Sequence, residues 1–181
     1  MEEAPQQGNA HTIFFVGFMG SGKSTLGHRL APRLNMKHID LDQEISRGED
    51  ADIRTLFNRL GEEEFRKLEQ SYLQKVFAKG PGLLVSTGGG TPCYEDNMAQ
   101  MLQHGLVIYL QVSESELFAR LRNSRQRRPL LEGYTGEALQ ARIGELFQLR
   151  EPFYRRASMT ADPRYLTTEL LQQMLANTQK L

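Results

Sequence analysis

A glycine-rich segment near the start of the chain has the pattern of a phosphate-binding loop. Residues 17–24 read GFMGSGKS and match G-x-x-x-x-G-K-[ST] at every fixed position. In this pattern backbone N–H groups surround phosphate oxygens, and the start of the following helix favours negative charge. We therefore expect a nucleoside triphosphate to bind here, with contacts from Gly20, Ser21, Gly22, Lys23, Ser24 and Thr25.

Two side chains of this loop carry specific chemistry. Lys23 can reach the β- and γ-phosphates as a positive charge, and the hydroxyl of Ser24 can bind the Mg²⁺ that bridges them. The alternative is a glycine-rich turn that binds no ligand. The complete motif and the apolar, strand-like run before it, Thr12–Val16, favour a nucleotide site with Mg²⁺ as cofactor.

Two carboxylates follow the next extended run. Asp40 and Asp42 are two residues apart, so in a strand both side chains lie on one face. Mg²⁺ takes one or two carboxylates and otherwise waters and phosphate oxygens, so we assign Asp40 to the metal through a water. Asp42 can then accept the proton of an attacking hydroxyl. The alternative is that one or both residues only cap a helix that begins near Gln43.

Two arginines can recognise a carboxylate on the acceptor. Arg66 and Glu69 are three residues apart in the helical run Glu62–Ala78, so the carboxylate can hold the guanidinium. Together with Arg150, Arg66 can bind a substrate carboxylate, because the planar guanidinium matches its two oxygens. Spacing alone, however, favours an ordinary surface ion pair.

A run of three glycines and a basic stretch complete the candidate residues. Gly88, Gly89 and Gly90 follow the strand-like run Leu83–Thr87, and a ligand can touch a backbone that lacks side chains. A flexible loop is the alternative. Arg128 lies in a stretch with proline and glycine and can neutralise charge on a transferring phosphoryl group. A solvated basic loop with no catalytic part is the other interpretation.

The apolar pattern predicts the elements that position these residues. Short β-rich runs alternate with longer helical patterns, which predicts an α/β fold of three layers with helices on both faces of a central parallel sheet. Ligands bind beyond the carboxyl ends of the strands in such sheets. The five expected strands are Thr12–Val16, Lys37–Leu41, Leu83–Thr87, Leu106–Val112 and Met159–Ala161. A helix is expected from Thr135 to Arg150, bending or ending near Pro152.

Composition limits the possible partners and locations. The 181 residues are 39% apolar, and we expect a polar, disordered tail over 1–11 and one domain over 12–181. Lysine plus arginine equals aspartate plus glutamate, at 22 each, so no basic excess indicates nucleic-acid or membrane binding. A single cysteine, Cys93, and a start without a signal peptide predict a cytoplasmic protein.

The order of the motifs resembles the shikimate kinase family. The resemblance covers about 12–175 and rests on the phosphate-binding loop, Asp40-Leu41-Asp42, Phe65-Arg66-x-x-Glu69, Gly88-Gly89-Gly90, Arg128-Pro129-Leu130-Leu131 and Arg150-x-Pro152-x-Tyr154. It implies a P-loop NTPase fold like that of nucleoside monophosphate kinases, with a five-stranded parallel sheet and a mobile lid at about 123–134. It also implies ATP-dependent phosphorylation of the 3-hydroxyl of shikimate, giving shikimate 3-phosphate and ADP in aromatic amino-acid biosynthesis.

The resemblance also implies roles for the acceptor-site residues. Asp42 would contact the shikimate hydroxyls, Arg66 and Arg150 would bind the carboxylate, and Gly88–Gly90 would form a backbone wall. Lys23, Asp42 and Arg128 would be the catalytic residues of what we expect to be a monomer.

Some assignments stay open after the resemblance is taken into account. Arg127 can replace its neighbour Arg128 in the lid, and either Arg120 or Arg122 can contact adenine. Ser86 and Thr87 stand where many phosphate-loop enzymes carry a second acidic motif, so metal binding would depend on Ser24 and Asp40. A kinase for another hydroxy acid, such as gluconate, is the alternative enzyme. A catalytically silent nucleotide-binding module is the alternative of a different class.

Overall fold

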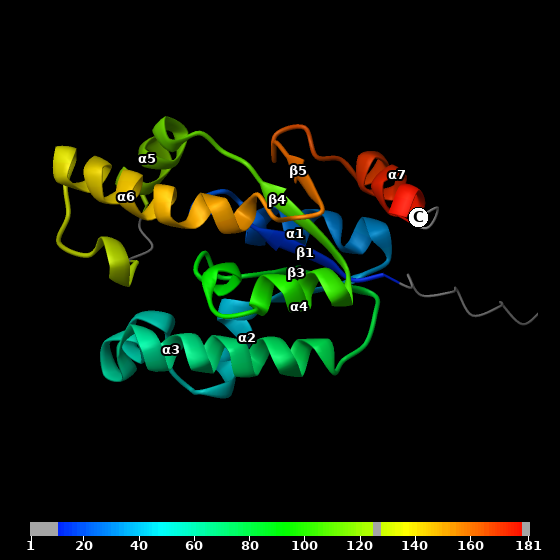
Figure 1. The fold of residues 1–181 in the computed structure, drawn as a ribbon, viewed down its shortest axis with the longest axis horizontal. Helices are drawn as coiled ribbons and strands as arrows, with labels where there is room; N and C mark the ends of the chain where they lie inside the picture. Colours follow the sequence, from blue (N-terminus) through cyan, green and yellow to red (C-terminus); the bar gives the residue numbers. More distant parts are fainter. Residues whose placement is uncertain (1–10, 125–127, 179–181) are drawn as a thin grey trace, which may run out of the picture.

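One parallel sheet organises the computed structural model, which describes residues 11–124 and 128–178 (Figure 1). Its strands lie in the order β2-β3-β1-β4-β5, and every neighbouring pair is parallel. The predicted five-stranded parallel sheet is therefore confirmed. The strands are β1 (Ile13–Val16), β2 (Lys37–Asp40), β3 (Leu83–Ser86), β4 (Leu106–Leu110) and β5 (Met159–Ala161).

The described helices follow the strands in the alternation that the sequence predicts. The α-helices are α1 (Lys23–Leu30), α2 (Leu41–Gly48), α3 (Ile53–Phe77), α4 (Asn97–His104), α5 (Glu114–Arg122), α6 (Gly136–Tyr154) and α7 (Thr168–Thr178). Three short 3₁₀ turns are η1 (Pro32–Leu34), η2 (Thr91–Cys93) and η3 (Pro129–Leu131). In the described ranges no helix is both long and apolar enough to cross a membrane.

The sheet is buried on both faces, which makes the fold a three-layer α/β/α sandwich. Alternate residues of β1 point to opposite sides: Phe14 and Val16 join one core, and Ile13 and Phe15 join the other. The first core is closed by α2 to α6, and the second by α1 and α7 (Figure 1). Strands buried on both sides read as continuous apolar runs, as β1 and β4 do here.

Helix α6 ends near Pro152, as its sequence pattern predicts. The helix includes the proline and ends two residues after it, at Tyr154. A proline removes one backbone donor, but the bond from Arg155 N–H to the Glu151 carbonyl, at 2.9 Å, carries the helical pattern past it. Arg150 therefore lies one turn before the helix end, and its side chain is buried.

Two predicted segments fall partly outside the described residues. Apart from His11, the expected N-terminal tail is not described. Of the expected lid at 123–134, residues 125–127 are not described, and these include Arg127.

Gly61 divides α3 into two helical parts. Its φ of 79° and ψ of 171° lie in a region that residues with a side chain rarely adopt. The kink separates the first two turns from the part that carries Arg66 and Glu69, which matches the helical run predicted from Glu62. A Cβ at this position would meet no atom within 4 Å, so only the backbone conformation requires glycine.

We expect Gly61→Ala to destabilise the protein through backbone strain alone. Such a conformation costs about 1–3 kcal/mol in a residue with a side chain, or a loss of several degrees in Tm for a chain of this size. Differential scanning calorimetry measures this change, with exposed Asn58→Ala in the same helix as the control. Equal Tm values for the two variants would contradict the strain argument.

Candidate active site

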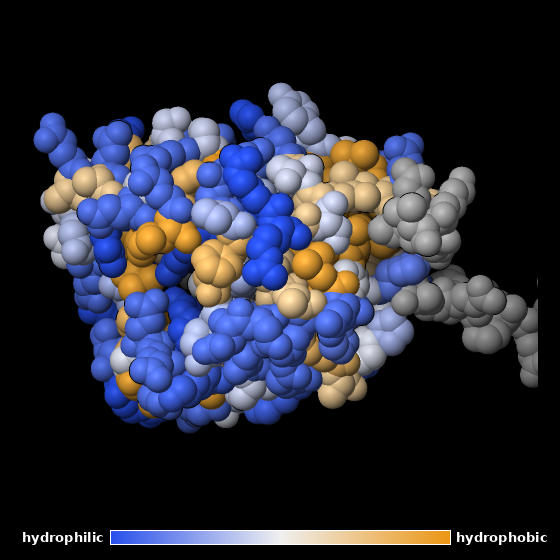
Figure 2. Space-filling model, viewed as in Figure 1, coloured by the Kyte–Doolittle hydropathy of each residue, from blue (hydrophilic) through white to orange (hydrophobic). Residues whose placement is uncertain are grey.

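A cavity of about 820 Å³ opens at the carboxyl ends of β1, β2 and β3. Figure 2 shows a hollow in the surface between the segments that Figure 1 draws as α3 and α6. All but one of the predicted site residues line this cavity: Gly20, Gly22, Lys23, Ser24, Thr25, Asp40, Asp42, Arg66, Gly88, Gly89, Gly90, Arg128 and Arg150. Ser21 lines a second cavity of about 350 Å³ on the other side of the loop.

Lys23 is the first residue of α1 and is held by the phosphate-binding loop itself. Its ammonium group donates hydrogen bonds to the carbonyls of Gly17 at 2.8 Å and Phe18 at 2.9 Å. Burial and, to a smaller extent, the nearby charge of Arg128 lower the pKa of Lys23 to about 7, although Asp42 and Asp40 oppose the shift. An anionic ligand in the cavity would favour the charged lysine, so this position is suited to phosphate.

Asp40 and Asp42 occupy different positions at the start of α2. Asp40 is the N-cap, and one of its oxygens accepts a hydrogen bond from the Gln43 N–H at 3.2 Å. The helix-capping alternative is therefore correct for Asp40, the residue that we assign to the metal. Only one of its two carboxylate oxygens accepts the capping hydrogen bond. Asp42 is the second residue of α2, is not the N-cap and lines the cavity together with Asp40.

Asp42 has the electrostatic environment of a proton acceptor. Burial and the negative charges of Glu69 and Asp40 raise its pKa to about 7, although Lys23 and Arg128 oppose the shift. A carboxyl group with this pKa is half ionised near neutral pH, which suits a general base. A carboxyl group with raised pKa thus lies in the same cavity as the phosphate-binding loop.

Arg66 and Glu69 form a buried ion pair, so the surface interpretation of their spacing is wrong. Arg66 is 8% exposed and Glu69 is 1% exposed. Glu69 accepts a hydrogen bond from Arg66 with one oxygen and, with the other, from the hydroxyl of Thr91 at 2.8 Å. Asn97 in turn donates to the Thr91 carbonyl at 2.9 Å. This network fixes the guanidinium that faces the cavity.

The three glycines leave room for this network as well as for a ligand. A Cβ at Gly88 would lie closer than 3.0 Å to a carboxylate oxygen of Glu69, and one at Gly90 equally close to the guanidinium of Arg66. Gly89 faces the Arg150 guanidinium, with its ideal Cβ position 3.6 Å from Nη1. The sequence predicted backbone access for a ligand; the structure adds that two of these glycines are needed for close packing against Arg66 and Glu69.

Tyr154 is a site residue to which the sequence assigned no role. Its hydroxyl donates to the Gly89 carbonyl at 2.5 Å. Burial raises the pKa of this hydroxyl, and the positive charge of the buried Arg150 opposes the shift. Tyr154 therefore holds the glycine wall close to one of the two candidate carboxylate-binding arginines. Arg150 and Tyr154 are four residues apart and share a face of α6, but the predicted helix stopped at Arg150 and gave no signal for this contact.

Comparisons with known proteins agree with this geometry. The family model described as shikimate kinase matches residues 19–179. The chain belongs to the shikimate kinase family. A shikimate kinase from Parabacteroides distasonis is 43% identical over 157 residues, which are 87% of this chain and 90% of that protein.

Two solved structures of the shikimate kinase family have the same fold. The shikimate kinase from Bacteroides thetaiotaomicron is 35% identical, with a TM-score of 0.80 over 94% of this chain and 97% of that chain. The shikimate kinase from Acinetobacter baumannii, solved in complex with shikimate, is 32% identical, with a TM-score of 0.84 over 94% of this chain and 96% of that chain.

In this member of the shikimate kinase family, the described part of the lid is anchored on two sides. Leu131 is buried in the core, and Glu132 accepts hydrogen bonds from two guanidinium nitrogens of Arg54, one of them at 3.1 Å. Both contacts follow Arg128 by only a few residues. Arg128 itself lines the cavity, where its charge affects both Lys23 and Asp42.

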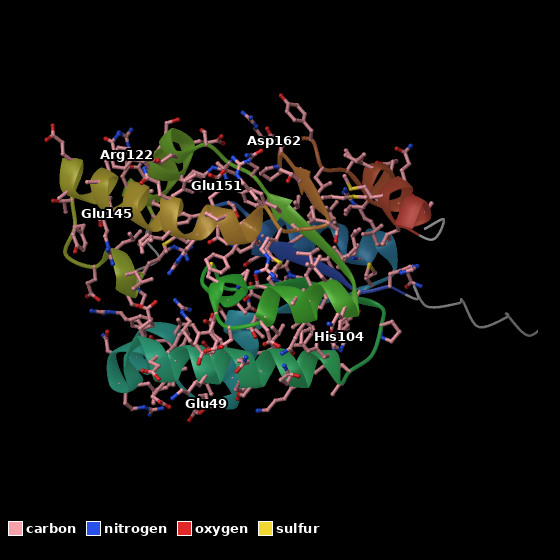
Figure 3. The ribbon with its side chains drawn as sticks, viewed as in Figure 1. Glu49, His104, Arg122, Glu145, Glu151 and Asp162 are labelled. Atoms are coloured by element: carbon pink, nitrogen blue, oxygen red, sulfur yellow. The ribbon has the colours of Figure 1, made fainter. Side chains whose placement is uncertain are left out.

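Of the two candidate adenine contacts, Arg120 and Arg122, one lines the second cavity and the other does not. Arg120 lines it, donates to the Gly20 carbonyl at 2.9 Å and pairs with Glu116 at 2.6 Å. Pro163 lines the same space. Arg122 is exposed on α5 and lines neither cavity (Figure 3). Of the two arginines, only Arg120 is therefore placed to contact a bound nucleotide.

We expect Tyr154→Phe to weaken the acceptor site more than the nucleotide site. The change removes the bond to Gly89 and leaves the ring in place, at a cost of about 0.5–1.5 kcal/mol. The KM for shikimate should rise by roughly 2- to 10-fold, while the KM for ATP changes little. Steady-state kinetics measures both constants, and a selective rise for ATP would contradict the assignment.

Proposed function

We propose that this protein transfers the γ-phosphoryl group of ATP to the 3-hydroxyl of shikimate, producing shikimate 3-phosphate and ADP. The observation that carries the proposal is that one cavity contains a phosphate-binding lysine, a carboxylate with raised pKa and two buried arginines. A phosphoryl donor, a proton acceptor and a binding site for an acidic acceptor are the three parts that this reaction needs.

Arg66 and Arg150 would bind the carboxylate of shikimate. Both are buried, and both line the cavity next to the glycine wall. Arg66 is oriented by Glu69 and also contacts Glu62 at 3.2 Å, and the Arg150 guanidinium lies beside Gly89 of the glycine wall. Guanidinium groups held in this way are ready to form bidentate bonds, so little conformational entropy is lost on binding.

Asp42 would accept the proton of the acceptor hydroxyl. As the hydroxyl oxygen forms its bond to the γ-phosphorus, the bond from that phosphorus to the oxygen of ADP breaks, and the hydroxyl proton moves to the Asp42 carboxylate. The raised pKa keeps the base strong enough to take the proton near neutral pH. Product release and loss of the proton to solvent would return the site to its starting state.

Positive groups around the phosphates would stabilise the charge that develops during transfer. Lys23 would move from the loop carbonyls to the β- and γ-phosphates, and Arg128 would approach the transferring group from the lid. The donor set of Ser24 hydroxyl and Asp40 carboxylate fits Mg²⁺, because one oxygen of Asp40 caps α2 and the other is left for a metal-bound water. Bound Mg²⁺ supplies charge neutralisation at the phosphate oxygens.

Adenine would lie in the second cavity, between Arg120 and Pro163. The contacts to Gly20 and Glu116 hold the Arg120 guanidinium plane in place, and a planar cation stacks well on a purine. This position beside the phosphate-binding loop is compatible with a single ATP spanning the two cavities, because Gly20, Gly22 and Thr25 line both.

We further propose that the protein functions as a monomer. All candidate catalytic and substrate-binding residues of the larger cavity come from one chain. Light scattering coupled to size-exclusion chromatography should give a mass near 20.6 kDa, and a dimer mass would overturn this part of the proposal. The cytoplasmic location stays a prediction from the sequence.

The direct test is ADP formation with purified protein, ATP and Mg²⁺ in the presence of different acceptors. We expect stimulation by shikimate, and none by gluconate, nucleoside monophosphates or buffer alone. Stimulation by gluconate alone would keep the nucleotide site and reject the acceptor assignment. Tight ATP binding without turnover on any acceptor would favour a silent nucleotide-binding module.

We expect Asp42→Asn to reduce kcat by about 100-fold or more while the Kd for ATP stays within a few-fold, because asparagine keeps the shape but cannot accept the proton. The wild-type kcat/KM for shikimate should fall as the pH drops below about 7, since protonation then removes the base in the free enzyme. The variant should lack this acid limb. An unchanged kcat in the variant would exclude Asp42 as the base.

We expect Arg66→Lys to raise the KM for shikimate by at least 10-fold and to leave the KM for ATP nearly unchanged. Lysine keeps the charge but cannot form the planar pair of bonds to a carboxylate. Exposed Arg59→Lys in the same helix is the matched control and should behave as wild type. Equal increases for both substrates would show that Arg66 acts on the site as a whole.

A further inference from the structure

A chain of hydrogen bonds links His38 to the backbone of the phosphate-binding loop. The Nε2 of His38 lies 3.0 Å from the hydroxyl of Ser86, and that hydroxyl donates to the carbonyl of Lys23 at 3.0 Å. His38 belongs to β2, Ser86 ends β3 and Lys23 begins α1. The chain therefore joins three elements at the point where they meet beneath the loop, and the proposed reaction does not use it directly.

The direction of these hydrogen bonds identifies which ring nitrogen of His38 carries a proton. A hydroxyl has one proton to donate, and Ser86 gives it to the Lys23 carbonyl, so Ser86 can only accept from His38. The Nε2 of His38 therefore carries a proton. Burial lowers the pKa of His38, and His28 on α1 lowers it further, while Asp40 on the same strand opposes the shift. A neutral ring with its proton on Nε2 satisfies this arrangement.

Helix α1 packs directly against the His38–Ser86 pair. An ideal Cβ at Gly27 would lie closer than 3.0 Å to His38 Nε2 and 2.8 Å from the Ser86 hydroxyl oxygen. The backbone of α1 at Gly27 therefore packs so close to the two polar side chains that a residue with a Cβ would not fit without a shift. The first turn of the same helix carries Lys23 and Ser24, whose positions relative to the phosphates decide their effect.

We propose that His38 is a positioning residue for the triphosphate site. By donating to Ser86 it keeps that hydroxyl on the Lys23 carbonyl, and the two side chains together set the position of the first turn of α1 on the sheet. The inference rests on the proposed function for its kinetic consequences, but its effect on nucleotide binding can be measured without turnover.

The test compares three single substitutions of histidine. His38→Leu removes the donor, whereas His38→Gln keeps an N–H donor at a similar distance from the backbone. His28→Leu is the matched control, because it removes the exposed ring that packs edge-on against His38, at 4.4 Å between centroids, and leaves the hydrogen bonds intact. Calorimetric titration gives the Kd for ATP with Mg²⁺, steady-state kinetics gives both KM values, and thermal unfolding gives Tm.

For His38→Leu we expect the Kd and the KM for ATP to rise by about 3- to 10-fold, the loss typical of one intramolecular hydrogen bond. The KM for shikimate should change less than 2-fold, His38→Gln should restore most of the ATP affinity, and His28→Leu should match wild type. In a Ser86→Ala background, His38→Leu should have no further effect on the Kd for ATP, because the connection is already broken.

Other outcomes would overturn the inference. An unchanged Kd for ATP in His38→Leu, equal losses for both substrates, or full additivity with Ser86→Ala would each reduce His38 to a packing residue. If wild-type protein failed to phosphorylate shikimate while the Kd for ATP responded as expected, the proposed acceptor would be wrong and the role of His38 would stand.

Discussion

The burial of charge in one cleft is the constraint on which the rest of this structure depends. Lys23, Arg66, Arg150 and Glu69 are each less than a tenth exposed. A buried charge is tolerated only where hydrogen bonds or an opposite charge replace water. Loop carbonyls do this for Lys23, and Glu69 does it for Arg66. Anionic substrates fit such a cleft because they add negative charge next to cations that have already lost their water.

The fold supplies these partners from segments far apart in the sequence. Parallel pairing brings the ends of β1, β2 and β3 to one edge of the sheet, so the loop and the two aspartates face the same cavity. The glycine wall then allows the ion pair of α3 to approach, and α6 contributes Arg150 as well as Tyr154, which is bonded to the glycine wall. The kink at Gly61 lies in α3, the helix that carries Arg66, and Pro152 lies in α6, the helix that carries Arg150.

The sequence was sufficient to predict the sheet and the members of the site, but not how they are held. Short β-rich runs predicted all five strands, most clearly the central β1, β3 and β4, which are buried on both faces and therefore nearly all apolar. Spacing could not tell which aspartate caps α2, since Asp40 and Asp42 are both good caps near the same helix start. It could not predict burial of Arg66 either, because that depends on Thr91 and the glycine wall, more than twenty residues away. The contact of His38 with Ser86 spans 48 residues and left no local signal.

The central claim is that buried guanidinium groups recognise the carboxylate of the acceptor. Calorimetric titration of the wild-type protein with shikimate and with its carboxamide, which is nearly the same size but neutral, tests this claim most directly. We expect the carboxamide to bind at least roughly 30-fold more weakly, since removing one partner of a buried, hydrogen-bonded charge pair costs about 2 kcal/mol or more. Equal affinity for the two compounds would contradict the account.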